Sequence, residues 1–398
     1  MASVKDIAKS INRAWKEDVL TAGNFAKELR RLSVGDVGFD YALYGGLPYG
    51  NIVVFSGVEH SGKTMAACLA MAQYQKENPD KVCVYVDAEN TLLTQSDFIH
   101  KMTGLSFDEN QFLRYDMTGR SGDEMFSDMI QLQAADNIGM IVIDSAPALV
   151  AQADMDNDFL KDNGQRASIA KPLGKFIKMM MMYLPKRNNI LLIINQVRVE
   201  GKTFTGATIY KEPCGYSLDY YPSMKVRFGK RTFTLGDKTD IAGSKGEGTD
   251  GFRLSFSVTK NRLGAMNRGG GFITFRLNSG LDLVGDTIEI ATKFNFIQRP
   301  NVQTYNLVDL ETGEIYTDLT TGEPLSFRGK QKLIDYLHEN KEFCKTYVDS
   351  LIKFISESAS QINLLDEDAM AEIVKEEAAV NSAYTEEEKA EVSEIENE

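Results

Sequence analysis

The chain contains few of the residues that build disulfide frameworks and zinc sites. Its 398 residues include four cysteines and three histidines. The cysteines, at positions 68, 83, 214 and 344, are far apart, and the first two lie in stretches expected to be buried. The histidines, at positions 60, 100 and 338, have no metal-ligand spacing. We therefore expect neither a disulfide framework nor a structural metal ion.

Long hydrophobic runs are also missing. No apolar stretch approaches the roughly 20 residues that cross a bilayer, and the first residues, Met-Ala-Ser-Val-Lys-Asp, have no signal-peptide pattern. The content of 43% hydrophobic and 25% charged residues is that of an ordinary globular protein. We expect a cytoplasmic protein without a membrane partner.

The net charge of -13 is unevenly placed along the chain. Residues 366–398 hold thirteen acidic and two basic residues, which leaves 44 acidic and 42 basic residues in positions 1–365. The body is therefore almost neutral, and its overall acidity does not argue against binding of nucleic acid, because that depends on local charge. The last 33 residues are expected to form an acidic disordered tail.

The most informative motif is Gly-Val-Glu-His-Ser-Gly-Lys-Thr at residues 57–64. It follows an apolar run at 52–55 and precedes a helix-favouring stretch at 65–72. Such a loop between strand and helix presents backbone N–H groups to phosphate, so a chance glycine-rich turn is the weaker alternative. The residues expected at the phosphates are Gly57, Glu59, His60, Ser61, Gly62, Lys63 and Thr64. The Thr64 hydroxyl is also expected to bind Mg²⁺.

Short apolar runs at 82–86, 140–143 and 190–194 leave room for helices between them. Runs of this kind, which do not alternate with polar residues, predict a parallel sheet covered on both faces. Residues 224–228, 252–260 and 272–277 alternate more and look like antiparallel strands that continue the sheet. A helix is expected over about 167–184, with Pro172 marking a break or a new start within it.

The same patterns predict a domain organisation. Residues 1–30 carry a basic amphipathic helix and a linker, residues 31–285 form an α/β ATPase core, and residues 286–365 form a small C-terminal α+β domain before the acidic tail. The N-terminal helix is interpreted as an oligomerisation helix, although such faces are often only solvated.

Polar residues close the predicted parallel strands. Glu89, Asp144 and Gln196 stand at or just after three strand ends. In open α/β sheets the ligand site lies outside the carboxyl ends of the strands. Asp144 is placed to hold Mg²⁺, Glu89 to orient a water as general base, and Gln196 to contact the γ-phosphate. Each residue alone is equally compatible with a polar strand end that caps the next helix.

Taken together, these segments resemble RecA-type DNA strand-exchange recombinases. The resemblance covers about residues 30–290 and is carried by residues 45–50, 57–64, 85–89, 141–145, 191–198 and 280–286. Residues 78–83 and the acidic tail are more similar to the phage UvsX-type branch, which would place the protein in a host-cell cytoplasm.

The resemblance implies roles for particular residues. Glu89 would be the catalytic glutamate, and Gln196 would link the ATP state to DNA. Lys260 and Arg262 match a basic pair that reaches the γ-phosphate held by a neighbouring protomer. Read without the family, these two cations are more often ordinary surface charges. The family's adenine-stacking tyrosine is absent, and Phe98 is the nearest aromatic residue.

Two segments are expected to contact DNA. Residues 198–216 form a long aperiodic stretch in which basic and aromatic residues interleave, a pattern that suits single strands. Its candidate DNA-binding residues are Arg198, Lys202, Phe204, Tyr210 and Lys211. Residues 152–168 align with the family's first DNA loop, with Lys161 and Arg166 as cations, although four aspartates there would repel phosphate. An ordinary surface loop is the alternative for residues 198–216.

The leading hypothesis is a DNA-dependent ATPase that uses ATP and Mg²⁺ to form helical filaments on single-stranded DNA and to exchange strands with homologous duplex DNA. A recombination mediator or a single-strand-binding protein is a further expected partner. Two alternatives share the core: a hexameric helicase motor, disfavoured by the short segment before the core, and a nucleotide-gated assembly module that does not hydrolyse. Glu89 argues against the second.

Overall fold

The computed structural model describes residues 3–16, 20, 29–133, 135–156, 169–202, 208–235, 238–239, 250–263, 269–318 and 322–362. It contains two compact units, residues 1–30 and residues 31–398. The predicted acidic tail lies outside the described residues, as do Lys161, Arg166 and Phe204.

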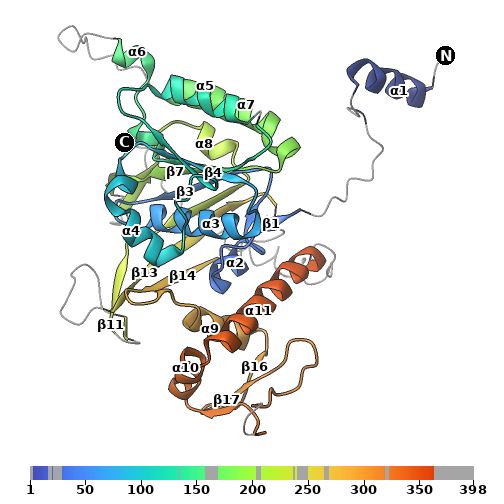
Figure 1. Ribbon diagram of the computed structural model, residues 1–398, viewed down its shortest axis with the longest axis vertical. Coiled ribbons are helices and arrows are strands. Elements are labelled where there is room, and N and C mark those ends of the chain that lie inside the picture. Colours follow the sequence, from blue (N-terminus) through green and yellow to red (C-terminus); the bar gives the residue numbers. More distant parts are fainter. Residues whose placement is uncertain are drawn as a thin grey trace, which may run out of the picture. The chain divides into compact units, whose positions relative to one another are not determined.

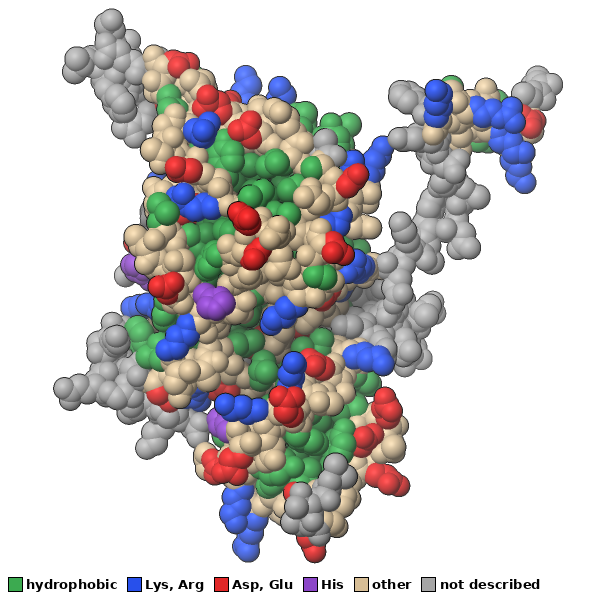
Figure 2. Space-filling view, in the orientation of Figure 1, with side chains coloured by type: hydrophobic (Ala, Val, Ile, Leu, Met, Phe, Trp, Pro, Cys, Tyr) green, Lys and Arg blue, Asp and Glu red, His purple; other side chains and the backbone are tan. Residues whose placement is uncertain are grey.

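The N-terminal unit contains one described helix, α1 (Val4–Trp15). Ser3 and Asp6 form a capping box at its start, which satisfies free N–H groups of the first turn. Val4 and Ile7 on its apolar stripe are 83% and 50% exposed. Lys and Arg side chains project from the helix (Figure 2). The predicted amphipathic helix is therefore present.

The second unit is built on a central sheet, with eleven strands among the described residues. Its main path runs β12-β11-β13-β10-β3-β7-β6-β4-β5, and β14 and β15 extend it beside β13. The bounds are β3 (Ile52–Gly57), β4 (Val82–Asp87), β5 (Phe112–Asp116), β6 (Ile138–Asp144), β7 (Ile190–Gln196), β10 (Met224–Phe228), β11 (Thr232–Leu235), β12 (Lys238–Thr239), β13 (Gly251–Asn261), β14 (Gly270–Arg276) and β15 (Gly280–Leu281). β1 (Arg31–Leu32) and β2 (Leu47–Pro48) form a separate pair.

Helices cover both faces of this sheet (Figure 1). One face carries α2 (Val37–Ala42), α3 (Lys63–Glu77) and α4 (Thr91–Thr103). The other carries α5 (Gly122–Leu132), α7 (Ala170–Arg187) and α8 (Ser217–Tyr220), and η1 (Ala146–Ala148) and α6 (Gln152–Met155) follow β6. Because both faces are covered, β3, β4 and β6 are buried along their whole length.

Two expectations about these elements hold only in part. β10 pairs antiparallel with β13, as predicted for residues 224–228, but it also pairs in parallel with β3. It therefore lies at the switch between the parallel and the antiparallel half of the sheet. Of the two options for Pro172, the structure has a helix start and not a break: α7 begins at Ala170, and Pro172 falls in the first turn, where no intrahelical donor is needed.

The C-terminal part packs around a third apolar cluster, which includes Leu307, Leu333 and Leu351. Its elements are α9 (Val284–Lys293), β16 (Ile297–Asn301), β17 (Thr304–Leu307), β18 (Ser326–Arg328), α10 (Lys330–Glu339) and α11 (Lys341–Ile362). The predicted boundary at residue 285 falls inside α9, and the position of the domain boundary stays a prediction. None of the described helices is long and apolar enough to cross a membrane.

Asp40 in α2 is a buried carboxyl group in the core. The Ser33 hydroxyl donates to Asp40 Oδ2, and the Val34 N–H donates to Oδ1 over 2.8 Å. Burial raises the pKa of Asp40 to about 7, although these hydrogen bonds oppose the rise. The unfolded chain releases the same proton near pH 4, so the stabilisation from this group is complete below about pH 4 and is lost as the pH rises to about 7.

We predict that Asp40→Asn removes the loss of stability that accompanies the rise in pH. The free energy of unfolding of the variant, measured by urea denaturation, should rise relative to wild type between pH 5 and pH 8. Glu109→Gln, at an exposed position, serves as the control and should show a constant difference. A wild-type-minus-variant difference that does not change with pH for Asp40→Asn would contradict the prediction.

Candidate functional site

The phosphate loop connects the carboxyl end of β3 to the first turn of α3. Gly62 has a φ of 87° and packs so tightly that an added Cβ would lie 2.3 Å from Leu254 Cδ2. A Cβ at Gly57 would lie 2.4 Å from the Phe228 carbonyl oxygen. Both glycines are therefore required by the close approach of β10 and β13 to the loop.

Lys63 is the first residue of α3, and its side chain turns back to the loop. The residue is 8% exposed. Its Nζ donates to the Val58 and Gly57 carbonyls over 2.8 Å and 3.2 Å and to Ser61 Oγ over 3.3 Å. Burial lowers the pKa of Lys63, while the nearby carboxylates of Asp144, Glu89 and Glu59 oppose the decrease. Glu59 and His60 point to solvent, with side chains 84% and 82% exposed.

Thr64 meets Asp144 across the sheet edge, and the magnesium site expected at these two residues stays a prediction. Thr64 Oγ1 donates to Asp144 Oδ2 over 2.6 Å. The Tyr85 hydroxyl donates to the same oxygen. Burial raises the pKa of Asp144 to about 6, and the hydrogen bonds from Thr64 and Tyr85 oppose this rise. A hydroxyl and a carboxylate at the mouth of a phosphate loop are oxygen ligands of the kind that Mg²⁺ prefers.

Glu89 follows β4 and is exposed. Its Oε1 accepts a hydrogen bond from Gln196 Nε2 over 2.9 Å and another from Ser145 Oγ. Three neighbouring strands, β4, β6 and β7, thus hold one carboxylate beside the loop. The sequence pattern points to Glu89 and Gln196 but assigns no role to Ser145 or Tyr85. In the sequence, the only signal for Ser145 was its position next to Asp144, and the only signal for Tyr85 was its position two residues before Asp87.

Lys260 and Arg262 lie away from this edge. In the strand register, Lys260 of β13 lies opposite Lys225 of β10, which lies opposite Val54 of β3. Asn261 lies opposite Met224, which in turn lies opposite Val53. The basic pair therefore lies level with the amino-terminal part of β3, whereas the phosphate loop follows its carboxyl end. Lys260 Nζ donates to the carbonyls of Asp219 and Tyr220. One chain does not bring these cations to its own loop.

The predicted aperiodic DNA segment contains a hairpin, so that expectation needs correction. β8 (Arg198–Lys202) pairs antiparallel with β9 (Thr208–Lys211). Arg198 lies directly opposite Lys211, and both are exposed. Like charges that face each other across a strand pair repel, and an anion between them relieves the repulsion. The side chains of Lys202 and Tyr210 are outside the described residues.

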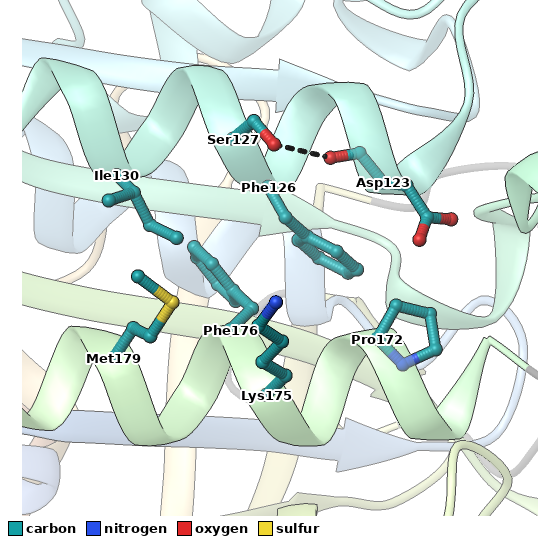
Figure 3. Close-up of a pocket in the computed structure, with 8 residues that line it drawn as sticks. All are labelled: Asp123, Phe126, Ser127, Ile130, Pro172, Lys175, Phe176 and Met179. Atoms are coloured by element: carbon teal, nitrogen blue, oxygen red, sulfur yellow. Dashed lines mark hydrogen bonds between the residues drawn. The ribbon is translucent and has the colours of Figure 1, made fainter.

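Two further hollows lie on the core. One, of about 530 Å³, lies beside the loop and is lined by Val58, Arg227, Phe228, Lys230 and Phe256 among others. The other, of about 320 Å³, lies between α5 and α7, where Phe126 stacks on Phe176 (Figure 3). Its polar lining residues are Asp123, Ser127 and Lys175. Among the described residues, no three His, Cys, Asp or Glu side chains are grouped to hold a metal ion.

The strand, loop and helix with Lys63, Thr64 and Asp144 define a P-loop protein, a class whose glycine-rich loop presents backbone N–H groups to phosphate. The model of the RecA N-terminal domain family matches residues 2–261. The chain belongs to the RecA family. Its similarity to the UvsX-type branch stays a prediction.

Several relatives span most of the chain. Protein RecA of Rickettsia canadensis is 25% identical over 346 residues, which are 87% of this chain and 89% of that protein. Protein RecA of Mycoplasma pneumoniae is 28% identical over 316 residues, 78% and 88% of the two chains. A crystal structure of the RadB recombinase is 19% identical and superposes with a TM-score of 0.42, covering 62% of this chain and 97% of that chain.

We predict that Tyr85→Phe weakens binding of a magnesium–nucleoside triphosphate complex about fivefold, because Asp144 loses a donor worth roughly 1 kcal/mol. Isothermal titration with a non-hydrolysable analogue measures the effect. Tyr115→Phe is the matched control, since that hydroxyl bonds Asp128 over 2.6 Å and should leave affinity unchanged. Equal affinities for Tyr85→Phe and wild type would show that this contact does not support the site.

Proposed function

We propose that this chain is an ATP-dependent recombinase that forms helical filaments on single-stranded DNA and exchanges strands with homologous duplex DNA. Membership of the RecA family supports this function. The observation that carries the proposal is the division of the site: the phosphate loop and Glu89 lie at one edge of the sheet, and Lys260 and Arg262 lie toward the other. An interface that places one edge against the next copy completes the site and propagates without closing.

The first half of the reaction site belongs to one protomer. In the proposed mechanism the loop N–H groups and Lys63 would bind the phosphates of ATP. Thr64 and Asp144 would hold Mg²⁺, which would supply positive charge to neutralise the phosphates. Glu89 accepts a proton from the attacking water. Ser145 and Gln196 aim its carboxylate, because both donate to the same oxygen. Hydrolysis then requires the Glu89 carboxylate to stay ionised and oriented.

The second half belongs to the neighbour. Lys260 and Arg262 of the next protomer would stabilise negative charge that develops on the γ-phosphate, so turnover depends on assembly. Burial lowers the pKa of Lys260, as do the nearby Arg262 and Lys225 cations. A bound phosphate would relieve this repulsion between cations. We assign α1 to self-association because its apolar stripe is exposed.

Gln196 connects the nucleotide to DNA. It bonds Glu89 and is separated from Arg198, the first residue of the hairpin, by Val197 alone. The facing cations Arg198 and Lys211 would bind the DNA backbone, together with Lys202, Phe204, Tyr210, Lys161 and Arg166 as predicted. A mediator or single-strand-binding protein is a further proposed partner, and the cytoplasm is the proposed location.

A complementation experiment tests the shared site. Glu89→Gln and Arg262→Ala proteins should each lose turnover by about a hundredfold or more, since each lacks one half of the site. Mixed in equal amounts on single-stranded DNA, they should recover about a quarter of the wild-type rate, because random assembly gives one interface in four both intact halves. Phosphate release measures the rate.

The control is a mixture of Glu89→Gln with a Lys63→Ala protein, in which both lesions affect the same half. This mixture should stay inactive. Should the Glu89→Gln and Arg262→Ala mixture also stay inactive while wild type turns over, the neighbour does not supply the cations.

A further inference from the structure

Arg114, on the edge strand β5, contacts residues on both sides of Glu89, the residue proposed as general base. β5 pairs in parallel with β4, with Arg114 beside Tyr85 and Asp116 beside Asp87. Because side chains alternate along a strand, Arg114 and Asp87 emerge on the same face of the sheet. Arg114 Nε donates to Asp87 Oδ2 over 2.8 Å. Asp87 is fully buried, and Arg114 is 21% exposed in its side chain.

The same guanidinium makes a second contact beyond Glu89. Arg114 Nη2 donates to Asn90 Oδ1 over 2.9 Å. One planar group therefore holds residues on both sides of Glu89, which stands between Asp87 and Asn90. The guanidinium fork suits this task, since its donors have fixed spacing and direction.

The turn that carries Glu89 is fixed at its other points as well. Asp87 Oδ1 accepts the Thr91 N–H over 2.9 Å and so caps the start of α4. The Ala88 N–H donates to the Asp144 carbonyl over 2.8 Å. Asn90 has a φ of 55°, a left-handed conformation that non-glycine residues seldom adopt. The contact from Arg114 to its amide supports this conformation from the side of β5.

We propose that Arg114 is a positioning residue for ATP hydrolysis, one that fixes the turn from which Glu89 reaches toward the phosphate loop. This inference rests on the proposed function. A buried ion pair that only neutralises Asp87 is the structural alternative. Neutralisation needs the contact to Asp87 alone, whereas positioning also needs the contact to Asn90. The two readings therefore differ in what a substitution at each contact does.

Arg114→Lys separates them, because the ammonium keeps the charge beside Asp87 but cannot span both acceptors. We expect kcat for DNA-stimulated ATP hydrolysis to fall about tenfold or more, since small misplacements of a reacting group cost that much. KM for ATP and the thermal midpoint should stay within error of wild type. Arg120→Lys, a change at an exposed arginine further along the chain, is the matched control and should leave kcat unchanged.

Asn90→Gly tests the second contact without straining the turn, because glycine accepts the positive φ. It should lower kcat like Arg114→Lys, and the double variant should be no slower than the slower single variant, since both changes break one contact. Wild-type kcat in either single variant, or losses that multiply in the double variant, would overturn the inference. If wild type itself does not hydrolyse ATP, the proposed function fails and the role of Arg114 in hydrolysis fails with it, whereas wild-type kcat in a variant overturns the role of Arg114 alone.

Discussion

The parallel pairing of β3, β7, β6 and β4 is the constraint on which the site depends. It brings the ends of four strands, separated widely in the chain, to one edge with matched register. Thr64 and Tyr85 can then both donate to one carboxylate oxygen of Asp144, and Ser145 and Gln196 can both donate to one carboxylate oxygen of Glu89. A slip of one residue in any strand would turn these side chains to the wrong face.

Much of this edge could be predicted from sequence, because the signals are local. The phosphate loop is a contiguous motif with its strand and helix, and Asp144, Glu89 and Gln196 follow apolar runs. The hydrogen-bond partners of these residues could not be predicted. Ser145 meets Glu89 from 56 residues away and Tyr85 meets Asp144 from 59 residues away. Those contacts follow from strand order, which a local pattern does not contain.

The fold shows the same limit at β10 and at the hairpin. Strand direction depends on the neighbour that a strand pairs with, so the alternation of residues 224–228 could not reveal the parallel pairing with β3. The β8–β9 hairpin has facing cations and a register shift after Val199, and its pattern resembles that of an irregular loop. β10 lies beside β3, the strand that leads into the phosphate loop, and β8 begins two residues after β7 ends.

The division of charged groups between the two sheet edges makes assembly part of the proposed chemistry. Its most direct test is electron microscopy of the full chain with Mg²⁺, a non-hydrolysable ATP analogue and single-stranded DNA. We expect open helical filaments with the analogue at each interface between Lys63 of one protomer and Arg262 of the next. Monomers, or closed rings with Arg262 far from the analogue, would contradict it.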